Sequence, residues 1–336
     1  MPMKLIIQIP CYNEAETLSI ALADLPRQVD GFDSVDWLII DDGSSDRTVH
    51  VAQECGVDHI IRHTKNQGLA KAFMTGLDAC LKLGADVIVN TDADNQYNAA
   101  DIPALIRPIQ ENTAEIVVGA RPIQEIGHFS ALKKMLQRLG SWVVRKVSST
   151  EIPDAPSGFR AFSKQAAMQL NVFNEYTYTL ETIIQAGQKN MAITSVPVRV
   201  NEDLRPSRLF KSIPAYVQRS IMTIIRIFVI YKPFRFFSTI GLILITVGIV
   251  LGLRFLYAHF TQEEAGHIQS LILAAILIIS GFQTILVAFL ADVLAANRKM
   301  LEGIKYQLNF LRYEHTPLAS NSSNVQAKDR GLKTED

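Results

Sequence analysis

The stretch DVIVNTDADNQ, residues 86–96, decides the fold of this chain. It begins with a short apolar run and ends in polar residues, which is the pattern of a strand buried inside a sheet. Two aspartates, Asp92 and Asp94, follow the run one residue apart. Carboxylates so close together on a loop can face one divalent cation, and Mg²⁺ and Mn²⁺ prefer oxygen ligands. With Gln96 as a neutral oxygen donor, the loop predicts a metal site, whereas a solvated acidic turn is the alternative interpretation.

The same alternation runs through the first 120 residues. Strand-like runs occur at residues 4–9, 36–41, 59–63, 86–91 and 115–120, and segments with helical spacing lie between them. Strand–helix alternation predicts an α/β fold with a mostly parallel sheet. Ligands of such sheets bind at the carboxyl ends of the strands. Polar residues follow four of the strands there, at Tyr12-Asn13-Glu14, Asp41-Asp42, Asp92-Asp94 and Arg121.

The segment DDGSSD, residues 41–46, carries two kinds of signal. Ser45 or Asp46 can cap the helix that is expected to begin near Arg47. Capping does not explain Asp41 and Asp42, which stand at the end of the strand. Carboxylates at that position suit hydrogen bonds from the N–H of a base or from ribose hydroxyls, so the segment predicts part of a nucleoside site.

Composition excludes several classes of protein. Lys+Arg and Asp+Glu both number 33, so no overall basic field indicates a nucleic acid as partner. The three cysteines form no metal-binding pattern and are expected to be free thiols. The sequence also lacks a glycine-rich phosphate loop. A bound diphosphate would therefore need a metal and basic side chains, for which the candidates are Arg121, Arg160, Arg205 and Arg208.

Two apolar segments, residues 236–257 and 268–290, are each long enough to cross a hydrocarbon core as a helix. Two buried helices of a soluble core are the alternative interpretation, although soluble helices of that length normally carry a polar face. Lys and Arg flank the pair on both outer sides and are missing from the connecting loop AHFTQEEAGH. The positive-inside rule therefore predicts a protein of the cytoplasmic (inner) membrane with two transmembrane helices. Both the domain before them and the C-terminus are expected in the cytoplasm, and the connecting loop outside.

Six short motifs in order resemble family 2 glycosyltransferases, over about residues 4–235. The motifs are Pro10-Cys11-Tyr12-Asn13-Glu14, Asp41-Asp42-Gly43-Ser44, Asn66-x-Gly68, Asp92-x-Asp94-x-Gln96, Gly119-x-Arg121 and Asp154-x-x-Ser157-Gly158-Phe159-Arg160. Within that family they are similar to the branch that loads sugars onto polyprenyl phosphates. Each motif alone is weak, whereas six in the expected order are specific.

The resemblance implies a GT-A fold and an inverting transfer of a sugar from a UDP- or GDP-linked donor to a polyprenyl phosphate. It implies that Pro10, Tyr12, Asn13, Glu14, Asp41, Asp42, Ser157 and Gly158 bind the nucleotide sugar. It also implies that Asp92, Asp94 and Gln96 surround Mg²⁺ or Mn²⁺ and that Arg121, Arg205 and Arg208 face phosphates. The family's Gly-x-Ser-Lys segment reads Arg205-Pro206-Ser207-Arg208 here, so the glycine is absent and arginine replaces the lysine.

The expected domain division follows from the motifs and the apolar segments. We expect a GT-A catalytic domain over residues 1–204, basic juxtamembrane amphipathic helices over 205–235, a two-helix transmembrane hairpin over 236–290, a cytoplasmic amphipathic helix over 291–314 and a disordered tail over 315–336. The expected partners are a nucleoside-diphosphate sugar, a polyprenyl phosphate and the lipid bilayer, and the amphipathic segments could support a homo-oligomer.

Three other functions are weighed against the transferase. A processive polysaccharide synthase would carry a Gln-x-x-Arg-Trp motif and more membrane helices, and this sequence has neither. A hydrolase would need two carboxylates roughly 5–10 Å apart, a separation that Asp92 and Asp94 do not obviously provide. A membrane-anchored, non-catalytic sensor of sugar nucleotides or assembly scaffold would keep the nucleotide pocket, and it remains the main alternative.

Overall fold

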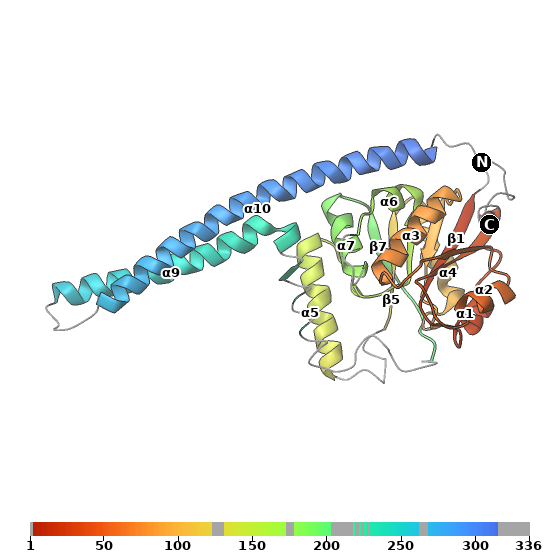
Figure 1. Ribbon diagram of the computed structural model, residues 1–336, viewed down its shortest axis with the longest axis horizontal. Helices are drawn as coiled ribbons and strands as arrows, with labels where there is room; N and C mark the ends of the chain where they lie inside the picture. Colours follow the sequence, from red (N-terminus) through yellow and green to blue (C-terminus); the bar gives the residue numbers. More distant parts are fainter. Residues whose placement is uncertain are drawn as a thin grey trace, which may run out of the picture.

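The computed structural model describes residues 3–122, 131–172, 178–202, 229–261 and 268–314, together with residues 218, 222, 225 and 226. Over these residues the chain forms an α/β domain followed by two long helices (Figure 1). The strands are β1 (Lys4–Cys11), β2 (Ser34–Asp41), β3 (His59–Arg62), β4 (Val87–Asn90), β5 (Ile116–Ala120), β6 (Arg160–Ser163) and β7 (Ile193–Pro197). The helices are α1 (Leu18–Asp24), α2 (Thr48–Glu54), α3 (Leu69–Lys82), the 3₁₀ turn η1 (Ala99–Asp101), α4 (Ile102–Gln110), α5 (Ala131–Ser148), α6 (Lys164–Gln169), α7 (Thr179–Gln188), α9 (Pro233–Phe260) and α10 (Ile268–Glu314).

These strands form one sheet in the order β3-β2-β1-β4-β6-β5-β7. Every neighbouring pair is parallel except those of β6, which runs antiparallel to both β4 and β5. The expected α/β fold with a mostly parallel sheet is therefore confirmed. β6 was not expected, because its four residues lie among turn-forming residues at 154–163. Its direction brings the 154–160 loop to the edge where β4 ends, since Asn90 pairs with Arg160.

Side chains alternate across the sheet and fill one core on each face. Leu5, Ile7 and Ile9 of β1 pack with apolar residues of α1, α2 and α4. Ile6 of the same strand packs with residues of α3 and α6 on the opposite face. Strands covered on both faces are apolar throughout, which explains the unbroken runs in the sequence. The sheet edge where the site residues gather is thus held by two buried cores.

Gly187 marks the tightest contact between two helices of the domain. A Cβ atom at this position of α7 would overlap with the carbonyl oxygen of Ser148, at the end of α5. Backbone atoms cannot move aside as a flexible side chain would, so we expect Gly187→Ala to destabilise the fold by about 3 kcal/mol. The matched control is Gly140→Ala on α5, where an added Cβ meets no atom within 4 Å. Thermal unfolding of the two variants checks this, and equal melting temperatures would contradict it.

The helices α9 and α10 form an antiparallel hairpin that extends away from the domain (Figure 1). Both are long and apolar enough to cross a membrane, and little of their apolar surface is buried within the chain. Three glycines bring their backbones together, because a Cβ at Gly241, Gly248 or Gly281 would lie within 3.0 Å of the facing helix. Close helix packing through glycine is a common arrangement of membrane hairpins.

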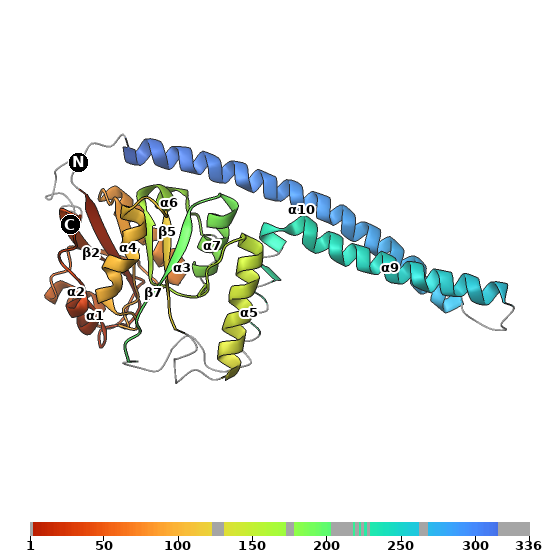
Figure 2. The same cartoon turned by 180° about the vertical axis from the view of Figure 1, so that it is seen from behind.

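The helix α10 does not end with its apolar part. The segments expected as a membrane helix and as a separate amphipathic helix form one continuous helix from Ile268 to Glu314. Its last turns run along the α/β domain beside α6, as Figure 1 and Figure 2 both show. Lys305 Nζ donates to Asn171 Oδ1 at 2.6 Å, and Asn309 Nδ2 donates to the carbonyl of Met168 at 3.1 Å. One unbroken helix therefore joins the hairpin to the domain.

Candidate active site

The polar residues expected at the strand ends do gather at one edge of the sheet. Tyr12 follows β1, Asp42 follows β2, the acidic loop (residues 91–96) follows β4 and Arg121 follows β5. Because β1 and β2 pair up to Cys11 and Asp41, the first two clusters leave the sheet side by side. Arg205 and Arg208 lie outside the described residues.

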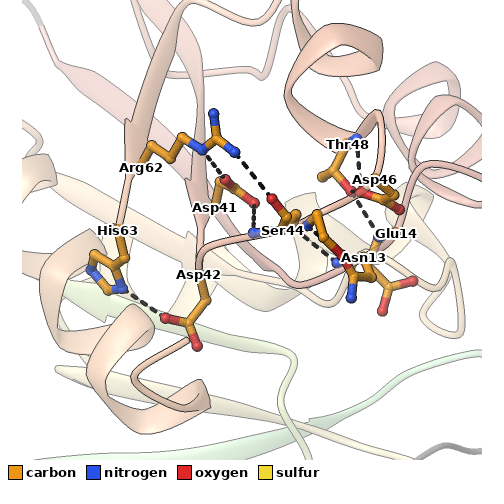
Figure 3. Close-up of polar contacts among 10 residues, drawn as sticks. Asn13, Glu14, Asp41, Asp42, Ser44, Asp46, Thr48, Arg62 and His63 are labelled. Carbon is orange, nitrogen blue, oxygen red and sulfur yellow. Dashed lines mark hydrogen bonds and ion pairs between the residues drawn. The ribbon is translucent and has the colours of Figure 1, made fainter. Parts of the chain in front are cut away.

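The loops after β1 and β2 are tied together by hydrogen bonds between their side chains and backbones (Figure 3). Asn13 has a left-handed backbone, with φ of 55°, and its side-chain oxygen accepts from the backbone N–H of Ser45 at 2.9 Å. Its own N–H donates to Ser44 Oγ at 2.9 Å. The N–H of Glu14 donates to Thr48 Oγ1 at 2.9 Å. Asn13 therefore fixes the shape of this corner.

Asp41 and Asp42 are both buried, and their carboxylates already have partners within the chain. Asp42 Oδ1 lies 2.7 Å from His63 Nδ1 and accepts from the N–H of Gln67, while its Oδ2 accepts from the N–H of Gly68 at 2.8 Å. Asp41 accepts from the N–H of Ser44 at 3.1 Å and faces Arg62 Nε at 3.1 Å (Figure 3). These two acids therefore hold the backbone of this corner in place.

The exposed aromatic side chain in this corner is that of Tyr12, with 46% of its surface accessible, whereas Pro10 is buried in β1. The N-cap of α2 is Arg47, which makes no side-chain cap hydrogen bond, and not the expected Ser45 or Asp46; Asp46, one residue earlier, still accepts from the N–H of Thr48 at 3.0 Å. Burial acts to raise the pKa of Asp46, but the hydrogen bonds from Thr48 and Ala15 outweigh it and lower the pKa. Tyr12 is therefore the group of this corner that is free to lie against a flat ring.

The acidic loop contains Asp92, a partly buried carboxylic acid whose pKa is raised strongly. Burial and then the charge of Asp94 raise the pKa of Asp92 to about 7, against the opposing charge of Arg121. Asp94 Oδ1 accepts from the N–H of Gln96 at 3.2 Å, and Asn95 between them is left-handed, with φ of 57°. The loop thus places the charge of Asp94 close enough to disfavour ionisation of Asp92.

The two carboxylates fit a divalent cation. Like charges placed together in a partly buried loop are relieved by a bound cation, and oxygen ligands suit Mg²⁺ and Mn²⁺. Within the described ranges, no group of three or more His, Cys, Asp or Glu side chains could hold a metal ion by itself. The remaining ligands of an ion at Asp92 and Asp94 would therefore come from a bound molecule or from water. Gln96 is less available, because its Oε1 lies 3.4 Å from Arg121 Nη1.

Arg121 is held by a buried carboxylate. Its Nε and Nη2 donate to the two oxygens of Asp154 at 2.7 and 3.1 Å, and its backbone N–H donates to Asp154 as well. Such a two-pronged pair fixes the plane of the guanidinium. Arg121 also lies over the ring of Tyr97, 5.7 Å from its centroid. The group expected to face phosphates is therefore oriented beside the acidic loop.

Arg160 has a different role from the one expected. It is completely buried, and it donates to the backbone carbonyls of Ala155, Ser157 and Thr179 at 2.7 to 2.8 Å. Burial lowers its pKa to about 10, so it stays charged at neutral pH. A cation that is surrounded by the chain's own carbonyls cannot reach a diphosphate. Arg160 instead holds the 154–160 loop against α7.

Gln8 and Asn90, which sequence reasoning missed, support the same loop from inside the sheet. Asn90 accepts from Gln8 Nε2 at 2.9 Å and donates to the carbonyl of Gly158 at 2.9 Å. Tyr178 Oη lies 2.8 Å from Asn90 Nδ2. The sequence could have indicated them, because an amide side chain in an otherwise apolar, buried strand needs a buried hydrogen-bond partner. Their partners hold Gly158 next to the acidic loop.

Comparison with known proteins agrees with this geometry. Residues 6–170 match the model of the family described as glycosyl transferase family 2. The UDP-N-acetylglucosamine–dolichyl-phosphate N-acetylglucosaminyltransferase of Methanococcus voltae is 32% identical over 216 residues, which are 57% of this chain and 83% of that protein. The chain belongs to glycosyl transferase family 2. This glycosyltransferase is also 27% identical over 219 residues to the undecaprenyl-phosphate mannosyltransferase of Micrococcus luteus, over 62% of this chain and 88% of that one.

A solved structure shares the fold of the glycosyltransferase. Glucosyl-3-phosphoglycerate synthase from Mycobacterium tuberculosis, in complex with Mn²⁺, uridine diphosphate and glucosyl-3-phosphoglycerate, superimposes with a TM-score of 0.51 at 18% identity. The match covers 66% of this chain and 80% of that one. The expected GT-A fold is thereby confirmed.

Gly158 of the glycosyltransferase leaves room for Asp92. A Cβ at Gly158 would lie 2.8 Å from Asp92 Oδ2 and 3.1 Å from Tyr178 Oη. We expect Gly158→Ala to push the carboxylate aside and to lower the transfer rate by on the order of 10²-fold, because small displacements of reacting groups are costly. A steady-state assay together with a melting curve measures both effects. A variant with normal kcat and an altered melting temperature would show that the contact serves only stability.

Proposed function

We propose that this family 2 glycosyltransferase moves a sugar from a nucleoside-diphosphate sugar to a polyprenyl phosphate, at the cytoplasmic face of a membrane and with Mg²⁺ or Mn²⁺. The observation that carries the proposal is the direct connection between the acidic site and an apolar hairpin. The same chain that holds Asp92 and Asp94 continues, through α9 and α10, into helices of membrane-spanning length. An enzyme built in this way suits an acceptor that resides in the bilayer.

The related proteins support each part of this reaction. The relative from Methanococcus voltae is named for UDP-N-acetylglucosamine and dolichyl phosphate, and the one from Micrococcus luteus for undecaprenyl phosphate. The structural neighbour was solved with Mn²⁺ and uridine diphosphate. Taken together, these names favour a nucleotide-linked donor, a phosphorylated lipid acceptor and a divalent cation for this chain as well.

The residues of the acidic loop carry the chemistry of the donor side. A Mg²⁺ or Mn²⁺ ion held by Asp92 and Asp94 would neutralise charge on the leaving nucleoside diphosphate. Arg121, fixed by Asp154, is oriented to add a second positive charge beside the same group. Tyr12, Asn13 and Glu14 form the corner proposed for the nucleoside, with Pro10, Asp41 and Asp42 as its buried wall, and Ser157 and Gly158 border the sugar.

The acceptor side needs little proton transfer. A phosphate monoester has its second pKa near 6, so its oxygen is largely ionised at neutral pH and can attack the anomeric carbon without a strong base. The acceptor phosphate needs cations, for which we propose Arg205 and Arg208. Lys146, Lys232 and Arg235 add positive charge at the start of α9, where burial and then the charge of Arg235 lower the pKa of Lys232.

Charge also supports the proposed orientation. Lys232 and Arg235 begin α9, and Arg298 and Lys299 follow the apolar part of α10, so both carry basic residues on the side of the catalytic domain. Under the positive-inside rule this side is the cytoplasm, with residues 205–235 at the bilayer surface and 236–290 within it.

A donor and acceptor panel tests the proposal. The full chain in lipid nanodiscs is incubated with Mg²⁺ or Mn²⁺, a set of UDP- and GDP-sugars, and undecaprenyl or dolichyl phosphate. We expect sugar in the organic phase that depends on metal and on Asp94, with none from Asp94→Ala. Tight binding of a nucleotide sugar with no lipid product across the full panel would favour the sensor or scaffold instead.

A further inference from the structure

The last part of α10, residues 293–313, has two unlike faces. The face towards the catalytic domain is polar and makes specific contacts. Glu302 lies 3.3 Å from Lys189 Nζ, Lys305 bonds Asn171, and Tyr313 bonds Asp78. This face accounts for how the helix is attached to the domain.

The opposite face is apolar and exposed. It consists of Val293, Leu294, Met300, Leu301, Ile304, Leu308 and Leu311, each with at least 54% of its surface accessible. A helix that packs on a soluble domain normally turns its apolar face inward and its polar face to water. Here the arrangement is reversed, and apolar patches of this size on soluble proteins mark contact surfaces.

The spacing of this face is that of a short coiled coil. Leucine recurs every seven residues, and a second apolar residue follows two of the three leucines by three positions. Apolar residues at the first and fourth positions of successive heptads form the contact line between supercoiled helices. The same spacing puts one polar residue, Asn297, into this line, and a single polar side chain there lowers stability but favours one register. We call the five apolar residues of the line the seam: Leu294, Leu301, Ile304, Leu308 and Leu311.

The bilayer is not placed to cover the seam. Phe234, next to the start of α9, contacts Phe289 with ring centroids 5.2 Å apart, so the hairpin's domain end is level with that part of α10. The seam lies beyond this level, where α10 runs beside α6 and the domain (Figure 2). Helices that lie on a membrane direct Lys and Arg towards lipid headgroups. In this helix Lys305 is instead bonded to the domain, Arg298 faces Tyr231 at 4.4 Å and Arg312 lies 4.0 Å from Asp78. Lys299 is the one of its four cations that has no such contact among the described residues.

We propose that the seam pairs with the seam of a second copy of this chain, in parallel, as a coiled coil that continues from the two hairpins. Two copies standing in one membrane bring identical seams into register. At about 100 Å² for each exposed aliphatic side chain, the five residues of the seam would bury on the order of 500 Å² per copy, and the flanking Val293 and Met300 would add to this at the rim. A standard interface buries about 800 Å² per partner. The inference rests on the proposed orientation in the membrane, but not on the identity of the sugar or the lipid.

Cysteine cross-linking in native membranes tests the pairing. In a Cys55→Ser background, Leu301→Cys places a thiol in the seam, whereas Gly303→Cys places one on the same helix outside it, where an added Cβ meets no atom within 4 Å. A disulfide needs Cα atoms about 4.4–6.8 Å apart, so we expect Leu301→Cys to give on the order of tenfold more linked dimer. Equal cross-linking of the two variants, or none in either, would overturn the proposal.

The mass of the full chain in nanodiscs gives a second measurement. We expect the wild type to contain more than one copy and the double variant Leu301→Gln/Leu308→Gln to contain one, since glutamine keeps the helix but removes the apolar contact. Phe310→Gln, on the same helix outside the seam, is the control and should keep the wild-type mass. A single-copy wild type, with an environment-sensitive dye at position 301 reporting lipid, would overturn pairing in favour of the bilayer. Neither measurement needs donor or acceptor, so failure here is separable from failure of the proposed reaction.

Discussion

Asp94→Asn should reduce sugar transfer by on the order of 10³-fold or more while leaving the fold intact. The substitution keeps the size of the side chain and removes one of the two charges that fit a divalent cation; single groups that stabilise developing charge contribute about 10²–10³-fold, and loss of the metal would add to this. The rate is measured with the donor and acceptor that the panel identifies, at several concentrations of Mn²⁺. Asp30→Asn, which changes an exposed acid away from the site, is the matched control.

Metal binding can be measured from the melting temperature, without an activity assay. We expect Mn²⁺ with UDP or GDP to raise the melting temperature of the wild type and to have little effect on Asp94→Asn. Asp92→Asn should lose activity as well, yet its melting temperature without metal should equal or exceed that of the wild type. The reason is that burial and Asp94 raise the pKa of Asp92, so its ionised form is unfavourable in the folded protein at neutral pH. Full activity of either variant would disprove the metal site. Full activity of the wild type under exhaustive chelation would disprove it as well.

Arg160→Met should be the substitution with the largest cost in stability. Three buried backbone carbonyls, those of Ala155, Ser157 and Thr179, accept from the guanidinium and would lose their donor. Each unpaired buried acceptor costs about 1–3 kcal/mol, so we expect a loss of roughly 3–5 kcal/mol. Thermal unfolding of the full chain in detergent measures this.

Two further variants separate the causes. Arg160→Lys keeps the charge but cannot reach three acceptors at once, so it should fall between the wild type and Arg160→Met. Arg107→Met removes an exposed arginine from α4 and should leave the melting temperature unchanged. If Arg160→Met melted like the wild type, the buried guanidinium would not be what holds the 154–160 loop.

The sheet could be predicted because most of its strands have a recognisable pattern in the local sequence. Runs such as VIV at 87–89 are apolar, as is typical of strands covered on both faces, and each is followed by polar residues at one edge. The acidic loop was found for the same reason. β6 was not predicted, because four residues among turn-forming residues are too few to show a strand pattern. Its partner strands are also more than 40 residues away in sequence.

The division of labour among the arginines could not be predicted. Arg121 and Arg160 both looked available for phosphates, and only the fold shows that one is oriented by Asp154 while the other is enclosed by carbonyls. Likewise, nothing local to Asp42 indicated that His63 and the N–H groups of Gln67 and Gly68 surround it. Asp154 is 33 residues from Arg121, and His63 is 21 residues from Asp42, so these pairs depend on the tertiary structure. The carbonyls around Arg160 depend on the fold of its own loop and of α7, and residue type alone does not reveal either.

The unbroken course of α10 has a consequence for how substrates meet. No loop interrupts α10 between the apolar hairpin and the contacts of its final turns with the domain, so we expect hairpin and domain to keep a nearly fixed separation. For the proposed reaction, this means that the site does not approach the lipid surface by a hinge in α10. We then expect the reach of the acceptor's phosphate to limit which lipids can receive the sugar.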